Sequence, residues 1–155
     1  MEGYSLQKFL KSPFPLRLLP YLLLIFALLG FLDATYLTIQ HYQHAIPPCT
    51  IGGCETVLTS TYATLIPHIP TSLIGVGFYL LIMVLAGMYL QTKNKALCPM
   101  LLALCSLGLI VGIGLIALQA FVLHAWCYYC LFSELIDFLL FDASWWLYNS
   151  LKNNS

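Results

Sequence analysis

Four long apolar stretches, separated by short polar segments, take up most of this 155-residue chain and limit what it can fold into. Each is long enough to cross the roughly 30 Å hydrocarbon core of a bilayer as a helix rising about 1.5 Å per residue. Only 8% of the residues are charged, whereas a soluble domain has roughly a quarter. We therefore expect an all-α integral membrane protein, a four-transmembrane-helix bundle whose spans lie near residues 18–40, 72–90, 97–123 and 130–148.

The first apolar stretch follows Lys8, Lys11 and Arg17, an arrangement that also occurs in signal peptides. Its apolar run is longer than the roughly 7 to 15 residues of a signal peptide, and no A-x-A cleavage site follows it. We therefore interpret it as a retained span.

The basic residues are distributed unevenly along the chain. In a four-span arrangement all six fall on one side: Lys8, Lys11, Arg17, Lys93, Lys95 and Lys152. The positive-inside rule makes that side cytoplasmic. It predicts a cytoplasmic tail over 1–16, a membrane domain over 17–148 with an outer loop over 41–71, and a second cytoplasmic tail over 149–155. The formal net charge of zero argues against a nucleic-acid partner.

The outer loop contains a cysteine pair and a helical pattern. Pro47 and Pro48 stop any preceding helix, and the segment from Cys49 to Cys54 contains two glycines that permit a tight turn. Apolar residues then recur at spacings of three and four: Cys54, Val57, Leu58, Tyr62 and Leu65. This pattern predicts a short interfacial helix of about three turns.

A second cysteine pair, Cys127 and Cys130, forms a CxxC motif at the start of the last apolar stretch. A helix N-terminus favours the thiolate and hence disulfide exchange, and both pairs face the oxidising compartment. Structural disulfides and a four-cysteine zinc site are the alternatives; we expect no metal. Four cysteines allow three pairings, which the sequence leaves open. The other two, Cys98 and Cys105, are expected to be buried apolar residues of the third span.

Several acidic residues lie within the apolar stretches, where a charge costs roughly 2.5 to 3.5 kcal/mol. Asp33 lies in the first stretch, and Glu134, Asp137 and Asp142 lie in the fourth. Glu134 is one helical turn below Cys130 on the same face, a position from which it could exchange a proton with a bound quinone. A neutral acid hydrogen-bonded between helices is the alternative. Five glycines in the second and third spans are expected at close helix contacts: Gly75, Gly77, Gly108, Gly112 and Gly114.

Taken together, these motifs resemble the vitamin K epoxide reductase family in its bacterial form. The resemblance rests on the loop from Cys49 to Ala63, on Ile69-Pro70-Thr71-Ser72-Leu-Ile-Gly75 with Tyr79, and on Trp126-Cys127-Tyr-Tyr-Cys130. It implies a thiol oxidoreductase of the bacterial inner membrane, with a quinone, ubiquinone or menaquinone, held against the CxxC. On the same basis we expect quinone contacts from Cys130, Glu134, Thr71, Ser72 and Ser60.

The resemblance also implies a route for electrons. Loop cysteines Cys49 and Cys54 would carry electrons from a thioredoxin-like partner, expected to be a separate protein because the chain ends at Ser155, and so support disulfide formation. Cys130 lies a turn deeper than Cys127, which suits it to meet the quinone while Cys127 meets Cys54. Animal members have asparagine in place of Thr71 and tyrosine in place of Glu134. A dithiol-driven reductase of vitamin K epoxide or quinone and a non-enzymatic four-span protein remain alternatives.

Overall fold

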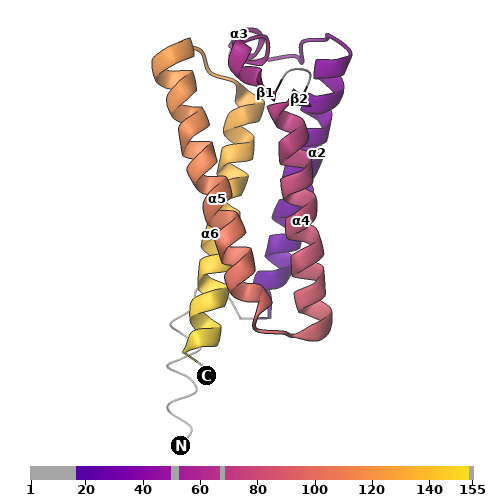
Figure 1. Ribbon diagram of the computed structural model, residues 1–155, viewed down its shortest axis with the longest axis vertical. Helices are drawn as coiled ribbons and strands as arrows, with labels where there is room; N and C mark the ends of the chain where they lie inside the picture. The colour runs from indigo at the N-terminus through magenta and orange to yellow at the C-terminus, as the bar shows by residue number, and fades with distance from the viewer. Residues whose placement is uncertain (1–16, 50–52, 67–68, 154–155) are drawn as a thin grey trace, which may run out of the picture.

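The computed structural model describes residues 17–49, 53–66 and 69–153. Four long helices run side by side along the molecule (Figure 1). They are α2 (Leu19–Tyr42), α4 (Thr71–Thr92), α5 (Leu97–Leu118) and α6 (Tyr128–Lys152). Their bounds agree with the four apolar stretches to within a few residues. The expectations for residues 1–16 and for Gly52 lie outside the described residues.

The helices bury a narrow apolar core and expose large apolar side chains on their outer faces. Helix α2 packs against α4 and α6, and α5 packs mainly against α6. The core includes the fully buried Leu23, Ile82, Leu101 and Leu140, whereas Ile110 on α5 is 67% exposed. Exposing so many large apolar side chains to water is unfavourable. This outer surface is therefore suited to contact with lipid.

Three of the described helical segments are long and apolar enough to cross a membrane: Leu19–Tyr42, Thr71–Thr92 and Leu97–Leu123. This agrees with the predicted helical membrane protein for three of its four expected spans. Helix α6 is long enough by its 25 residues, but it is less apolar and contains three carboxylic acids.

The two ends of the molecule differ in character. Figure 1 shows the start of α2, the end of α6 and the α4–α5 turn at one end, here called the terminal end, and the α2–α4 and α5–α6 connections at the opposite, loop end. The described basic residues other than histidine, Arg17, Lys93, Lys95 and Lys152, belong to the terminal end. The two cysteine pairs lie at the loop end.

The α2–α4 connection differs from the predicted three-turn helix. Only α3 (Cys54–Leu58) is α-helical; it is followed by the 3₁₀ turn η1 (Thr61–Ala63) and by an antiparallel pair, β1 (Thr64–Ile66) with β2 (Ile69–Pro70). The helix ends early because the hydroxyls of Thr59 and Ser60 donate to the carbonyls of Glu55 and Val57, a local bonding pattern that competes with helix continuation. Ser60 is then extended, with φ −66° and ψ 156°.

A π-helical segment, η2 (Gln119–Leu123), ends α5. The chain then turns at His124, which has a left-handed backbone with φ 47°, before α6 begins. This widened turn carries the buried Gln119 inward.

The glycine expectation was right in part. Gly108 lies against the Phe78 ring and Gly112 against the Glu134 carboxyl, so neither site has room for a Cβ, while Gly75 makes an ordinary contact with Ala34. For Gly77 and Gly114 the prediction was wrong, because an added Cβ would meet nothing within 4 Å. Both are exposed on the outer faces of their helices.

Candidate redox site

The loop cysteines form a disulfide at the loop end of the bundle. Cys49 and Cys54 are bonded to each other with their Cα atoms 6.0 Å apart. Cys54, the first residue of α3, is 0% exposed, whereas Cys49 is only half-buried. Of the pairings left open by the sequence, the structure has Cys49–Cys54, with Cys127 and Cys130 as free thiols.

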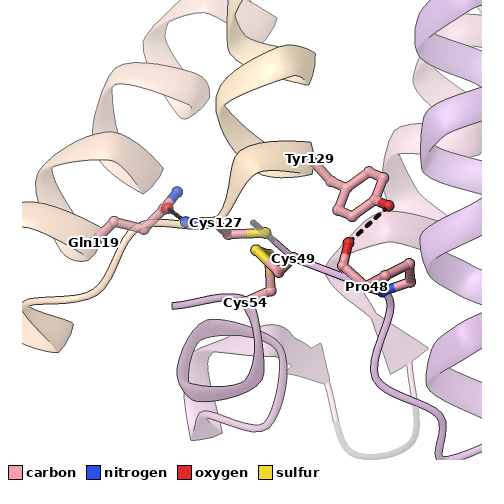
Figure 2. The surroundings of a disulfide bond; sticks show 6 residues. All are labelled: Pro48, Cys49, Cys54, Gln119, Cys127 and Tyr129. Atoms are coloured by element: carbon pink, nitrogen blue, oxygen red, sulfur yellow. Dashed lines mark hydrogen bonds between the residues drawn. A yellow bond between two sulfur atoms is a disulfide. The ribbon is translucent and has the colours of Figure 1, made fainter. Parts of the chain in front are cut away.

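The CxxC lies beside this disulfide. Cys127 is the N-cap residue of α6 and is 0% exposed; its side chain points toward the Cys49–Cys54 pair (Figure 2). Cys54, Val57 and Cys127 form a small buried cluster against which Cys49 and Cys130 pack. The structure therefore brings together all four cysteines singled out in the sequence.

The environment of Cys127 favours its thiolate. Its pKa is lowered to about 7, first by a hydrogen bond from the Cys130 side chain and further by the backbone N–H groups of Cys130 and Tyr129, while burial opposes the shift. A thiol with a pKa near ambient pH is well suited to exchange, both as an attacking and as a leaving group.

Two polar side chains that the sequence did not single out fix the site. The Cys127 N–H donates to Oε1 of Gln119 at 2.9 Å, and Gln119 is only 2% exposed. The Tyr129 hydroxyl donates to the Pro48 carbonyl at 3.2 Å. Figure 2 shows these contacts on opposite sides of the cysteines. A lone amide in an otherwise apolar stretch was the available signal for Gln119.

A cavity of about 760 Å³ lies among α2, α4, α5 and α6 below the loop. Its walls are mainly apolar, and they include all five residues expected to contact a quinone: Cys130, Glu134, Thr71, Ser72 and Ser60. Cys127 is not part of the wall. The cavity has the size and character of a site for a largely apolar ligand with a few polar anchors, so the residues present fit a quinone.

The intramembrane acids are accommodated in different ways. The Ser133 hydroxyl donates to Asp33 at 2.6 Å, and the Tyr79 hydroxyl donates to Asp137 at 2.8 Å. Asp142 is exposed. Glu134 is 9% exposed, lines the cavity and lies over Gly112. Asp33 and Asp137 thus fit the hydrogen-bonded alternative, while Glu134 faces the space where a ligand would bind.

The remaining cysteines lie away from the site. Cys98 and Cys105 are 2% and 1% exposed within the main core, and neither is in a disulfide. This agrees with the prediction that they are small buried apolar residues.

A helical bundle with apolar outer faces, carrying a disulfide against a dithiol, defines an integral membrane protein with a cysteine redox site. The sequence profile of the vitamin K epoxide reductase family matches residues 21–145, a range that includes all four cysteines of that site. The chain therefore belongs to the vitamin K epoxide reductase family, and it is a membrane oxidoreductase. No individual curated protein matches it significantly.

Proposed function

We propose that this chain is a quinone-dependent thiol oxidoreductase. It oxidises a separate thioredoxin-like partner, passes the electrons through Cys49/Cys54 and Cys127/Cys130 to ubiquinone or menaquinone, and so supports disulfide formation. One observation carries the proposal: within the CxxC, Cys127 faces the loop disulfide while Cys130 lines the cavity. Each cysteine is thereby next to a different reaction partner.

The first step follows from the unequal exposure of the loop cysteines. A partner thiolate can reach the half-buried Cys49 but not the fully buried Cys54. Attack on the Cys49 sulfur forms a partner–Cys49 disulfide and releases Cys54 as a thiolate. The other thiol of the partner then attacks the partner sulfur that is bonded to Cys49. This completes the partner disulfide and frees Cys49.

The second step moves the electrons to the CxxC. With Cys127 and Cys130 oxidised, the Cys54 thiolate attacks the Cys127 sulfur beside it, forming Cys54–Cys127 and releasing the Cys130 thiolate. Cys49 next attacks Cys54, which restores the loop disulfide and releases Cys127. The low pKa of Cys127 makes it a good leaving group. The result is the state described above, a loop disulfide beside a CxxC dithiol.

The third step uses the cavity. A bound quinone supplies the acceptor for two electrons and two protons. Cys130 delivers the electrons because its side chain lines the cavity, and Cys127 closes the disulfide with it. Thr71, Ser72 and Ser60 supply hydroxyl groups for holding the ligand, and Glu134 is placed to hold or move a proton. The overall change is partner dithiol plus quinone to partner disulfide plus quinol.

The membrane arrangement is part of the proposal. Helix α6 forms the fourth span, in which Asp137 accepts a hydrogen bond from Tyr79 and Glu134 faces the cavity. The terminal end is cytoplasmic, with tails over 1–16 and 149–155, and the membrane domain over 17–148 exposes its loop, 41–71, on the outer side of a bacterial inner membrane. The basic residues at the terminal end support this orientation.

A reconstitution experiment tests the activity. The full chain in lipid vesicles containing ubiquinone or menaquinone is supplied with a reduced thioredoxin-like protein, and quinol and partner disulfide are both measured. We expect one quinol per partner disulfide, and no quinol from the Cys130→Ala variant. Quinol formation that survives in Cys130→Ala, or none with either quinone in the parent, would refute the proposal. Turnover of vitamin K epoxide alone would favour the reductase alternative.

A further inference from the structure

We propose that Gly53 and Tyr129 are positioning residues that hold the loop disulfide against Cys127, together forming what we call the loop seat. The loop seat consists of the contact of Gly53 with Trp126 and the hydrogen bond from Tyr129 to Pro48. The inference rests on the proposed function, because it concerns the exchange between Cys54 and Cys127.

Gly53 determines how closely the loop approaches the segment before the CxxC. A Cβ at this position would lie 2.5 Å from the carbonyl oxygen of Trp126 and 2.6 Å from its nitrogen. These are backbone atoms, which cannot rotate away as the end of a side chain can. The backbone at Gly53 has φ −107° and ψ −5°, torsions open to other residues. Glycine is therefore needed here for space rather than for its torsional freedom.

The contact is next to both exchanging cysteines in the sequence. Gly53 precedes Cys54, and Trp126 precedes Cys127. If the backbones at Gly53 and Trp126 move apart, the sulfur atoms of Cys54 and Cys127 therefore move apart as well. Both cysteines are 0% exposed, so their side chains are enclosed by the cluster and have little freedom to compensate.

Tyr129 holds the other side of the loop. Its hydroxyl donates to the carbonyl of Pro48, the residue before Cys49, and its ring packs on Tyr36 of α2 with centroids 5.5 Å apart. Because Tyr129 is one of the two residues between the CxxC cysteines, this bond ties the loop to the same helical turn that carries Cys127 and Cys130. Gly53 and Tyr129 thus fix the loop on both flanks of its disulfide.

The test measures how fast Cys54 and Cys127 form a disulfide, because this rate depends on how closely the two sulfur atoms are held. The test uses the full chain with Cys49→Ala and Cys130→Ala, which leaves Cys54 and Cys127 as the reacting pair. Diamide, an azo oxidant, takes two electrons and two protons from these two thiols and so forms their disulfide. The rate of disulfide formation is measured by mass mapping. We expect Gly53→Ala to slow this reaction on the order of 10- to 100-fold, as an ångström-scale misplacement does. Gly77→Ala, where an added Cβ meets nothing within 4 Å, is the matched control and should keep the parent rate.

Tyr129→Phe provides an independent variant that keeps the ring on Tyr36 and loses only the hydroxyl. We expect it to slow the reaction about three- to tenfold, a fold-change typical of one neutral hydrogen bond. Both variants should keep the thermal unfolding midpoint of the parent within a few degrees, which a general loss of structure would not allow.

The outcomes separate the loop seat from the electron route. Rates within twofold of the parent for Gly53→Ala would overturn this inference alone and leave the proposed function standing. If Gly53→Ala does not fold, an unchanged rate in Tyr129→Phe has the same meaning. A parent that forms no Cys54–Cys127 disulfide would overturn the electron route, and this inference with it.

Discussion

At the scale of single residues, the two CxxC cysteines differ in what surrounds them. Cys127 is buried against the loop disulfide, is hydrogen-bonded to Gln119 through its N–H, and has a lowered pKa. Cys130, one turn further along α6, borders the cavity. One local motif thereby presents two sulfur atoms to two different places, a division that a relay between a protein thiol and a lipid-soluble acceptor requires.

The pKa of Cys127 predicts a pH dependence. Because the pKa is lowered from 9.0 to about 7, the thiolate is favoured in the folded protein above pH 7 and is lost as the pH falls through that value. The ultraviolet absorbance of the thiolate, taken as the difference from Cys127→Ser, should have its midpoint near pH 7. In Cys130→Ala the midpoint should rise, because the largest cause of the lowering is removed. A midpoint that does not move would show that Cys130 is not that cause.

Alanine variants of the six cysteines should fall into two groups by their partner-oxidation activity. Alanine at Cys49, Cys54, Cys127 or Cys130 should abolish partner oxidation, since each exchange needs its own thiolate. Alanine at Cys98 or Cys105, both in the core, should leave activity within a few-fold of the parent. The measurement is quinol formation in the vesicle assay. Full turnover in Cys49→Ala would remove the loop from the mechanism.

At the scale of elements, the long helices and the meeting of the cysteine pairs could be predicted from the sequence, because apolar length and charge placement are local signals. The end of α3 and the β1–β2 pair could not be predicted from the apolar spacing, since the hydroxyls of Thr59 and Ser60 override it. Gln119 and Tyr129 were missed for another reason. Their partners, Cys127 and Pro48, lie 8 and 81 residues away. The lone amide of Gln119 in an apolar stretch is a signal that the residue is special, but no local pattern predicts the π-helical turn that carries it inward.

The α5–α6 contact predicts a difference between two neighbouring glycines. Gly112→Ala would place its Cβ into the Glu134 carboxyl, while at Gly114 a Cβ meets nothing within 4 Å. Because the atoms that would have to move are the end of the flexible Glu134 side chain beside the cavity, we expect Gly112→Ala to destabilise the fold by no more than about 1 kcal/mol, the low end of overpacking costs. Gly114→Ala should be neutral or stabilising by up to about 1 kcal/mol. Thermal unfolding in detergent measures both, and equal effects would contradict the close contact.

At the scale of the whole molecule, charge and chemistry lie at opposite ends. The described lysines and Arg17 belong to the terminal end, whereas the disulfide and the CxxC belong to the loop end, where residues of the loop also line the cavity. The positive-inside rule favours a cytoplasmic terminal end. The disulfide favours an outer loop end, because disulfides persist on the outer side. Both arguments therefore favour the same orientation. In the proposed orientation and mechanism, the molecule collects electrons on the outer side and releases them within the membrane.

The orientation can be tested by labelling. Single cysteines placed at Thr64, in β1, and at Asn153, after α6, are exposed to an impermeant thiol reagent in intact cells, in a background where the native cysteines are replaced. We expect labelling at position 64 only, with position 153 labelled after the cells are opened. Labelling at 153 in intact cells without labelling at 64 would invert the topology and deprive the proposed chemistry of its compartment.

In the proposed function, the four cysteines at the loop end exchange electrons with membrane quinone. The most direct measurement alkylates thiols in living cells and maps the redox state of each pair, with and without quinone synthesis. We predict that Cys127 and Cys130 accumulate as thiols when quinone is depleted and return to the disulfide when it is restored, and that the Cys130→Ala variant shows no such response. Cysteine pairs whose redox state is the same at every quinone level would contradict the account and leave a membrane protein with a structural disulfide.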